Sequence, residues 1–119
     1  MIVRTIAVLF GVVALSASAL AFEGTYDASD RGMEQGAVIT KARDGTYKVN
    51  VSVGARGCMG EFDGIGKVEG KTLIVRKPDK TDTCKLTLTQ AGKTLSVKED
   101  RCLTWHGASC QFEGTLRKQ

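Results

Sequence analysis

The chain has 119 residues, with 17 Lys and Arg against 13 Asp and Glu, and a formal net charge of +4. This weakly basic balance, with 6% aromatic residues, is far from the composition of a nucleic-acid-binding protein, so we expect no nucleic-acid partner. A single histidine leaves few groups for metal or acid–base chemistry, and we expect neither a metal nor another cofactor.

The first 21 residues have the three parts of a secretory signal peptide. Arg4 supplies a positive charge, residues 6–15 form an apolar stretch, and Ala19 and Ala21 form a small-residue cleavage site. The apolar stretch is shorter than the about 20 residues of a membrane-spanning helix, which makes an uncleaved anchor the weaker alternative. We expect a cleaved signal peptide at 1–21 and a single domain at 22–119. This domain is expected in the periplasm or outside the cell, not spanning a membrane.

The predicted domain alternates apolar and polar residues with a period of two, which is typical of antiparallel strands with one buried face. A polar segment at 29–35 is expected to connect two strands and to hold one helical turn. The tetrapeptide Phe-Glu-Gly-Thr occurs at 22–25 and again at 112–115, and we expect these first and last strands to pair. The predicted fold is all-β: a disulfide-stapled antiparallel β-barrel or sandwich of about eight strands. The clearest alternating segments are residues 47–53, 72–76, 85–89 and 94–98.

Three glycine-containing turns set the expected pairing register, because a slip of one residue would turn every side chain to the other face. The third turn also places Cys84 opposite Glu99. About Asp44-Gly45, Glu69-Gly70 and Ala91-Gly92, the expected opposite pairs are Val38 with Val51, Gly66 with Leu73, and Leu88 with Leu95.

Four cysteines in an exported chain of this size predict two disulfides that supplement a small core. Sequence spacing alone leaves the connectivity open. Cys58 and Cys84 both lie at inward positions, and the expected register keeps Cys84 away from Cys102. We therefore predict Cys58–Cys84 and Cys102–Cys110. A zinc site is the alternative, and the lack of a C-x-x-C spacing argues against it.

The residues offer no catalytic constellation. His106 and Ser109 are close in sequence, but no third group is identifiable that would orient the histidine. We expect a protein without enzymatic activity. Lys71 and Arg76 belong to a basic cluster around the predicted strand at 72–76, which could attract an anionic envelope ligand. A solvated strand face is the alternative interpretation of that cluster.

The segment 102–110 is the main candidate for recognition, because a loop closed by its own disulfide would lose little entropy on binding. Trp105, His106 and Ser109 lie in it, and tryptophan is enriched at binding hot spots. The alternative is that Trp105 folds back over one end of the barrel while His106 bonds to the backbone.

An exported barrel of this size with disulfides resembles the periplasmic inhibitors of c-type lysozyme. The resemblance implies a barrel that inserts a loop into the lysozyme cleft and binds the catalytic carboxylates. The family's Ser-Gly-Ser-Gly loop is absent, and the nearest segment is Gly60-Glu-Phe-Asp-Gly64-Ile-Gly66. No family residue is therefore assigned to this chain. The expected partner is a protein, with c-type lysozyme as one candidate, or an anionic envelope ligand.

Overall fold

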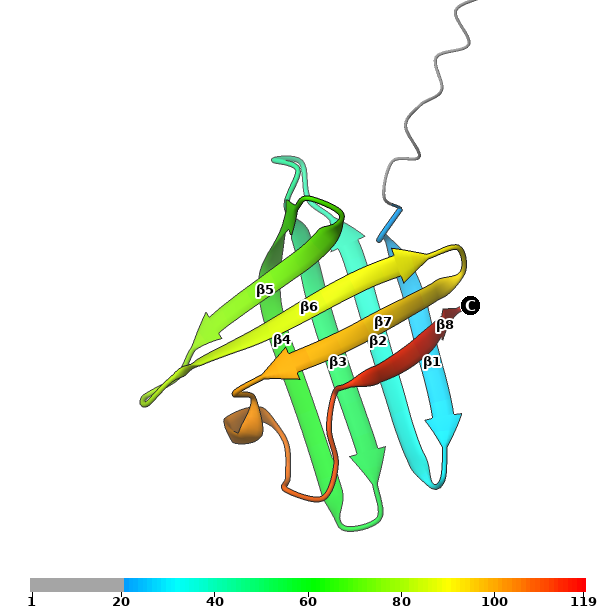
Figure 1. Ribbon diagram of the computed structural model, residues 1–119, viewed down its shortest axis with the longest axis vertical. Helices are drawn as coiled ribbons and strands as arrows, with labels where there is room; N and C mark the ends of the chain where they lie inside the picture. Colours follow the sequence, from blue (N-terminus) through cyan, green and yellow to red (C-terminus); the bar gives the residue numbers. More distant parts are fainter. Residues whose placement is uncertain (1–20) are drawn as a thin grey trace, which may run out of the picture.

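A computed structural model describes residues 21–119, so nearly all of the predicted signal peptide lies outside the described residues. The described chain forms a closed antiparallel barrel in which each strand pairs with the next and the last returns to the first (Figure 1). The predicted all-β barrel is confirmed. The elements are β1 (Gly24–Asp30), β2 (Met33–Lys41), β3 (Tyr47–Ala55), β4 (Cys58–Glu69), β5 (Thr72–Pro78), β6 (Thr83–Ala91), β7 (Thr94–Asp100), the 3-10 helix η1 (Leu103–Trp105) and β8 (Gly114–Lys118).

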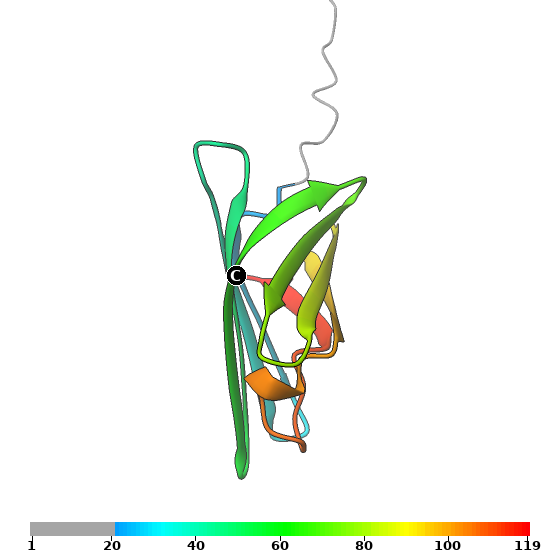
Figure 2. The same cartoon turned by 90° about the vertical axis from the view of Figure 1, so that its left-hand side faces the viewer.

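The barrel is flattened into two layers (Figure 2). Strands β1 to β4 form one layer, and β5 to β8 cross in front of them in Figure 1. The hairpins β1–β2 and β3–β4 extend below the second layer, and the segment between β7 and β8 lies over this lower part. That segment closes one end of the barrel.

The core fills the barrel from alternating positions, as the period of two predicts. Phe22 and Phe112 of the repeated tetrapeptide are both fully buried. The expected contact between the first and last strands is confirmed, because Tyr26 lies opposite Lys118 and Asp27 opposite Arg117. Closing the barrel in this way pairs the edges of the sheet. The largest fully buried side chains include Tyr26, Phe22, Phe62, Phe112, Ile39, Leu73, Leu86, Leu88, Leu95 and Leu116.

The expected register at the first turn is wrong by one residue. Val38 lies opposite Asn50 and points outward, while Ala37 takes the place opposite Val51. The connection is longer than a two-residue turn, because the N–H of Ala42 donates to the carbonyl of Thr46 across the whole loop. The longer loop sets the register, and the face of β2 follows from it.

At the other two turns the expected register is off by two residues, which keeps the predicted faces. Leu73 lies opposite Val68, and Leu88 lies opposite Val97. Gly70 and Gly92 have positive φ angles of 64° and 60°. Each glycine is the first residue of a two-residue turn, whereas the prediction made it the second. Tight hairpin turns need a positive φ at their first residue, and glycine adopts it without strain.

The helical turn expected in 29–35 is wrong. Residues 24–30 and 33–41 form a continuous hairpin about Arg31-Gly32. Both turn residues have positive φ, 50° and 78°, which matches the twist of a tight hairpin better than a helical turn does.

The predicted disulfide connectivity is also wrong, since the bridges are Cys58–Cys110 and Cys84–Cys102. The two-residue shift at the β6–β7 turn brings Lys85 opposite Asp100. Cys84 precedes Lys85 on β6 and Cys102 follows shortly after Asp100, so the two cysteines lie beside each other. The Cα atoms of Cys84 and Cys102 are 4.6 Å apart. Cys110 is left to pair with Cys58, at a Cα–Cα distance of 5.9 Å.

Candidate functional site

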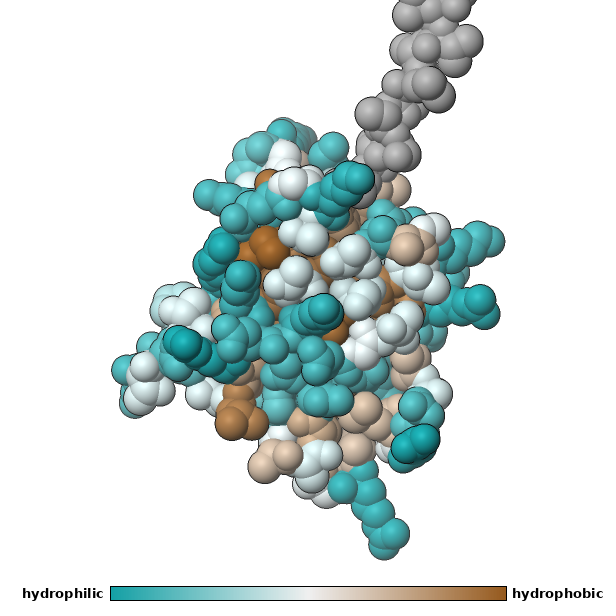
Figure 3. All heavy atoms as spheres, viewed as in Figure 1, coloured by the Kyte–Doolittle hydropathy of each residue, from teal (hydrophilic) through white to brown (hydrophobic). Residues whose placement is uncertain are grey.

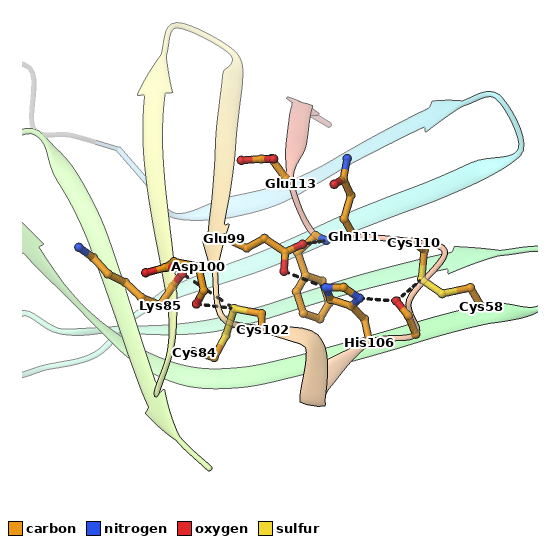
Figure 4. A network of polar contacts seen from close by, with 12 residues as sticks. Cys58, Cys84, Lys85, Glu99, Asp100, Cys102, His106, Cys110, Gln111 and Glu113 are labelled. Atoms are coloured by element: carbon orange, nitrogen blue, oxygen red, sulfur yellow. Dashed lines mark hydrogen bonds and ion pairs between the residues drawn. A yellow bond between two sulfur atoms is a disulfide. The ribbon is translucent and has the colours of Figure 1, made fainter. Parts of the chain in front are cut away.

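The segment between β7 and β8, residues 101–113, carries most of the residues predicted to bind, and we call it the anchored loop. Cys102 ties its beginning to Cys84 on β6, and Cys110 ties its end to Cys58 at the start of β4 (Figure 4). The predicted Cys102–Cys110 bridge would have closed the loop on itself. Instead, the loop is fastened to two different strands. This arrangement restricts the loop at both ends.

His106 lies inside the anchored loop with both ring nitrogens engaged (Figure 4). Its Nε2 is 2.8 Å from Oε2 of Glu99 on β7, and its Nδ1 is 2.6 Å from the carbonyl oxygen of Gly107. The side chain of His106 is 3% exposed and that of Glu99 13%. The other oxygen of Glu99 accepts the backbone N–H of Phe112 at 2.8 Å. Since both ring nitrogens face oxygen acceptors, an imidazolium paired with a carboxylate satisfies every group in this network.

A close backbone contact holds the same part of the loop on β4. Gly60 and His106 form an isolated β-bridge, and the N–H of Gly107 donates to the carbonyl of Met59. A Cβ atom at position 60 would lie 2.3 Å from the Cβ of His106. Glycine is required there because the two backbones approach too closely for any side chain.

Trp105 folds back onto the barrel rather than forming an exposed tip. Its ring packs edge-to-face on Phe62, with centroids 5.6 Å apart. The ammonium of Lys77 lies 4.5 Å from the centre of the indole ring, within the range of a cation–π interaction. The indole Nε1 is buried without a hydrogen-bond partner. Of the two interpretations of Trp105 and His106, the structure favours the one in which both hold the loop on the barrel.

Ser109 is exposed on the anchored loop. His106 is buried, and its two nitrogens are occupied by Glu99 and Gly107. A serine activated by this histidine would need one of those nitrogens as its proton acceptor. The two residues therefore do not form a nucleophile–base pair in this structure.

Two residues that hold the loop were missed in the sequence. Gln35 is a buried polar side chain of β2, and its Nε2 donates to the carbonyls of Gln111 at 3.0 Å and Glu113 at 2.8 Å. A glutamine at an inward position of an alternating strand was the available signal, because a buried amide needs partners. Glu99 carried no such signal, since its partner His106 comes from another element.

Asp79, between β5 and β6, fastens the loop from the other side. The pKa of its carboxyl is lowered to about 2, first by the side chain of Thr104 and then by the backbone N–H groups of Thr81 and Asp82. These N–H groups donate to Oδ1 of Asp79 at 2.8 and 2.7 Å. The negative charge thus organises the β5–β6 turn and also interacts with Thr104 within η1.

The predicted basic residues lie elsewhere on the barrel. Lys71 is in the β4–β5 turn, and Arg76 is on the outer face of β5, where it forms an ion pair with Glu69 at 2.7 Å. Since the anchored loop contacts the beginning of β4 and the turn follows its end, the structure does not join Lys71 and Arg76 to Trp105, His106 and Ser109 in one site.

The outer surface around Arg76 contains two adjoining hollows. One, of about 330 Å³, is lined by residues of β2, β3 and β4 that include Val38, Lys48 and Ile65. The other, of about 250 Å³, is lined by Ile65, Lys67, Ile74 and Arg76. Ile65 belongs to both hollows, so they form one continuous surface.

Within residues 21–119, no cluster of three or more His, Cys, Asp or Glu is arranged to hold a metal ion. In the same part of the chain, no helix is long and apolar enough to cross a membrane.

No family model matches the sequence, and comparisons with curated proteins and with solved structures find no match either.

Proposed function

We propose that this chain is a non-catalytic binding protein of the exported compartment that recognises a protein partner with the anchored loop. The observation that carries the proposal is that both ends of the loop are fastened by disulfides to separate strands. The inward side chains of the loop are used for packing. Between the two cysteines of the loop, Leu103, Thr104, Ala108 and Ser109 are the residues left exposed on this rigid support.

Rigid attachment favours binding because the loop has little conformational freedom left to lose when a partner orders it. Leu103 is 71% exposed at the start of η1, directly after the cysteine that joins the loop to β6. An apolar side chain held out by a fixed backbone is a suitable anchor for a pocket on a partner.

The absence of catalysis is part of the proposal, and the state of His106 supports it. A general base needs a free nitrogen within reach of a substrate proton. Both nitrogens of this ring are bonded, and the ring is almost fully covered. Between the two cysteines, the exposed residues of the loop supply no other acid–base group.

The first candidate partner is c-type lysozyme, in keeping with the resemblance to its periplasmic inhibitors. The test is the lysis of bacterial cells by lysozyme, followed by turbidity, with the purified protein in molar excess. Lysis should slow with the wild type and with Val68→Glu, a change at an exposed apolar residue at the far end of β4 from the loop, but not with Leu103→Glu. Undiminished lysis with the wild type would remove lysozyme as the partner.

A second candidate function is the binding of an anionic envelope ligand at the outer surface around Arg76. It is favoured by one observation: Arg76 and Lys85 lie directly opposite each other on neighbouring strands. Like charges in this position destabilise a sheet. Glu69 offsets part of the repulsion through its ion pair with Arg76, and an added anion beside Lys85 would relieve the rest. Thermal-shift measurements with the polyanion heparin test this candidate, since binding should raise the melting temperature. An unchanged melting temperature would count against it.

A further inference from the structure

The outer surface around Ile65 and Ile74 combines apolar and basic side chains from five neighbouring strands. In register, Arg76 lies opposite Lys85, Lys67 lies opposite Ile74, and Thr87 lies opposite Lys98. Lys48 lies opposite Ile65 on the other side of β4. The register therefore places cations beside both isoleucines, with Lys48 and Lys67 next to Ile65, and Lys67 and Arg76 next to Ile74. We call this surface the basic face: Lys48, Ile65, Lys67, Ile74, Arg76, Lys85 and Lys98.

The apolar centre of the basic face is accessible. Ile65 is 53% exposed although it lies in the middle of the sheet, and Val38 beside it in the first hollow is 46% exposed. Ile74 points outward yet is 7% exposed, and it shares the second hollow with Lys67 and Arg76. The long stems of lysine and arginine cover apolar surface while their charges stay in water. Moving these stems would uncover a continuous apolar strip.

Three acidic groups lie on or beside the basic face, including Asp63 in the lining of the first hollow, and each is engaged by another residue. Glu69 binds Arg76, and the pKa of Glu69 is lowered first by this hydrogen bond and also by the charges of Arg76, Lys85 and Lys67. Asp63 accepts a hydrogen bond from Asn50 at 2.6 Å. Asp100 lies opposite Lys85 and is paired with Arg101. Lys48, Lys67 and Lys98 form no ion pair within the described residues, which leaves positive charge around the isoleucines.

The visible side of the second layer agrees with this arrangement. Figure 3 shows a mainly hydrophilic surface over β5 to β8, with apolar surface showing between the polar side chains. An anion alone would be satisfied by the lysines and arginine. The exposed Ile65 favours a ligand that also has apolar groups close to its charge, since burying apolar area is favourable.

We propose that the basic face is a docking surface for membranes that contain anionic lipid, with the cations on the lipid phosphates and Ile65 among the upper acyl methylenes. This inference rests on the second candidate function and names its ligand. Peripheral binding of this kind combines apolar burial with attraction of Lys and Arg to anionic headgroups. The anchored loop has no part in it.

The experiment is co-sedimentation of the protein, purified from the exported fraction, with phosphatidylcholine vesicles that contain or lack phosphatidylglycerol. We expect binding only when phosphatidylglycerol is present, weakened by salt and not displaced by inorganic phosphate at the same ionic strength. The double variant Lys67→Gln/Lys85→Gln should bind about tenfold or more weakly, since each lysine contributes a factor of about five at an anionic surface. Ile65→Thr, which keeps a β-branched side chain, should weaken binding several-fold.

The matched control is Lys80→Gln/Lys93→Gln, which removes the same charge from exposed turns outside the basic face. It should bind nearly as well as the wild type, and circular dichroism should show that all variants remain folded. Equal loss in the two lysine pairs would overturn the inference, because attraction would then follow net charge alone. So would binding to heparin without binding to anionic vesicles, an outcome that leaves the second candidate function standing. Failure to bind either would remove both.

Discussion

Glu99 joins two separate parts of the anchored loop, because one of its oxygens lies 2.8 Å from Nε2 of His106 while the other accepts the N–H of Phe112. The ring of His106 in turn packs edge-to-face on Phe112, with centroids 5.0 Å apart. One carboxylate on β7 therefore fixes both the middle of the loop and the chain that enters β8.

Replacing Glu99 should destabilise the fold, and the cost should grow with the number of buried polar groups that lose their hydrogen-bond partner. Glu99→Ala leaves a buried histidine and a buried N–H without partners, and we expect a loss of about 3 kcal/mol in the free energy of unfolding. Glu99→Gln keeps the shape and can bond both groups when the ring is neutral, so its cost should be about 1 kcal/mol. Urea denaturation followed by circular dichroism measures both values. Equal costs for the two variants would show that the pairing is not what holds the loop.

Gly60→Ala should displace the loop from β4, since its methyl group would lie 2.3 Å from the Cβ of His106 and 2.9 Å from the carbonyl oxygen of Trp105. We expect a loss of about 1–3 kcal/mol, as for other overpacked sites, and a change in Trp105 fluorescence. Gly54→Ala is the matched control, because nothing lies within 4 Å of a Cβ at that position. Fluorescence-detected unfolding of the two variants should differ clearly, and identical curves would refute the close contact.

The two disulfides should differ in their contribution to stability. Cys58–Cys110 spans 52 residues and Cys84–Cys102 spans 18. Restriction of the unfolded chain predicts about 4 kcal/mol for the longer loop and about 3 kcal/mol for the shorter one. The measurement is denaturation of the paired serine variants Cys58→Ser/Cys110→Ser and Cys84→Ser/Cys102→Ser. Non-reducing peptide mapping of the wild type should recover the same two pairs, and a Cys58–Cys84 peptide would contradict the structure.

The fluorescence of Trp105 should depend on Lys77. The indole packs on Phe62 beneath the ammonium group, so acrylamide should quench its fluorescence weakly in the native protein. Lys77→Gln removes the cation, and we expect stronger quenching and a loss of about 0.5–1 kcal/mol. Lys80→Gln serves as the control in the following turn. Strong quenching in the wild type would instead place Trp105 in solvent.

Acid should loosen the contact between the β5–β6 turn and the anchored loop. The pKa of Asp79 is lowered to about 2 by Thr104, Thr81 and Asp82, and an unfolded aspartate titrates near pH 3.9. A depressed carboxyl pKa contributes stability that is present above the unfolded value and is lost as pH falls through the folded value. The contribution should therefore disappear between about pH 4 and about pH 2. Carboxyl carbon NMR should give a midpoint near 2 for Asp79, and Asp79→Asn should remove this part of the pH dependence.

Local pattern was sufficient for the strands, whereas the choice between a barrel and a sandwich was left open until the structure showed the closed barrel. Alternation of apolar and polar residues identifies which side of each strand is buried, because the side-chain period of a strand is two. The echo between Phe22 and Phe112 correctly joined the ends of the chain, since both are core residues that lie just before the paired strands β1 and β8.

The turns were the weakest part of the prediction. Gly45 belongs to a loop longer than two residues, and Gly92 occupies the first turn position rather than the second. A glycine marks a place where φ can be positive, but it does not state how many residues the turn contains. The error at Gly92 moved Cys84 away from Cys102, and the disulfide prediction failed with it.

By itself, the sequence determined the strand class, most of the buried faces and the presence of disulfides, because alternation and composition are local properties of the chain. Only the tertiary structure decided that the sheet closes into a barrel, which cysteines meet, why His106 is covered by Glu99, and that Arg76 and Lys85 lie side by side next to Ile74. Such contacts join residues from different strands, and their geometry depends on exact turn lengths that local hydrophobic periodicity does not encode.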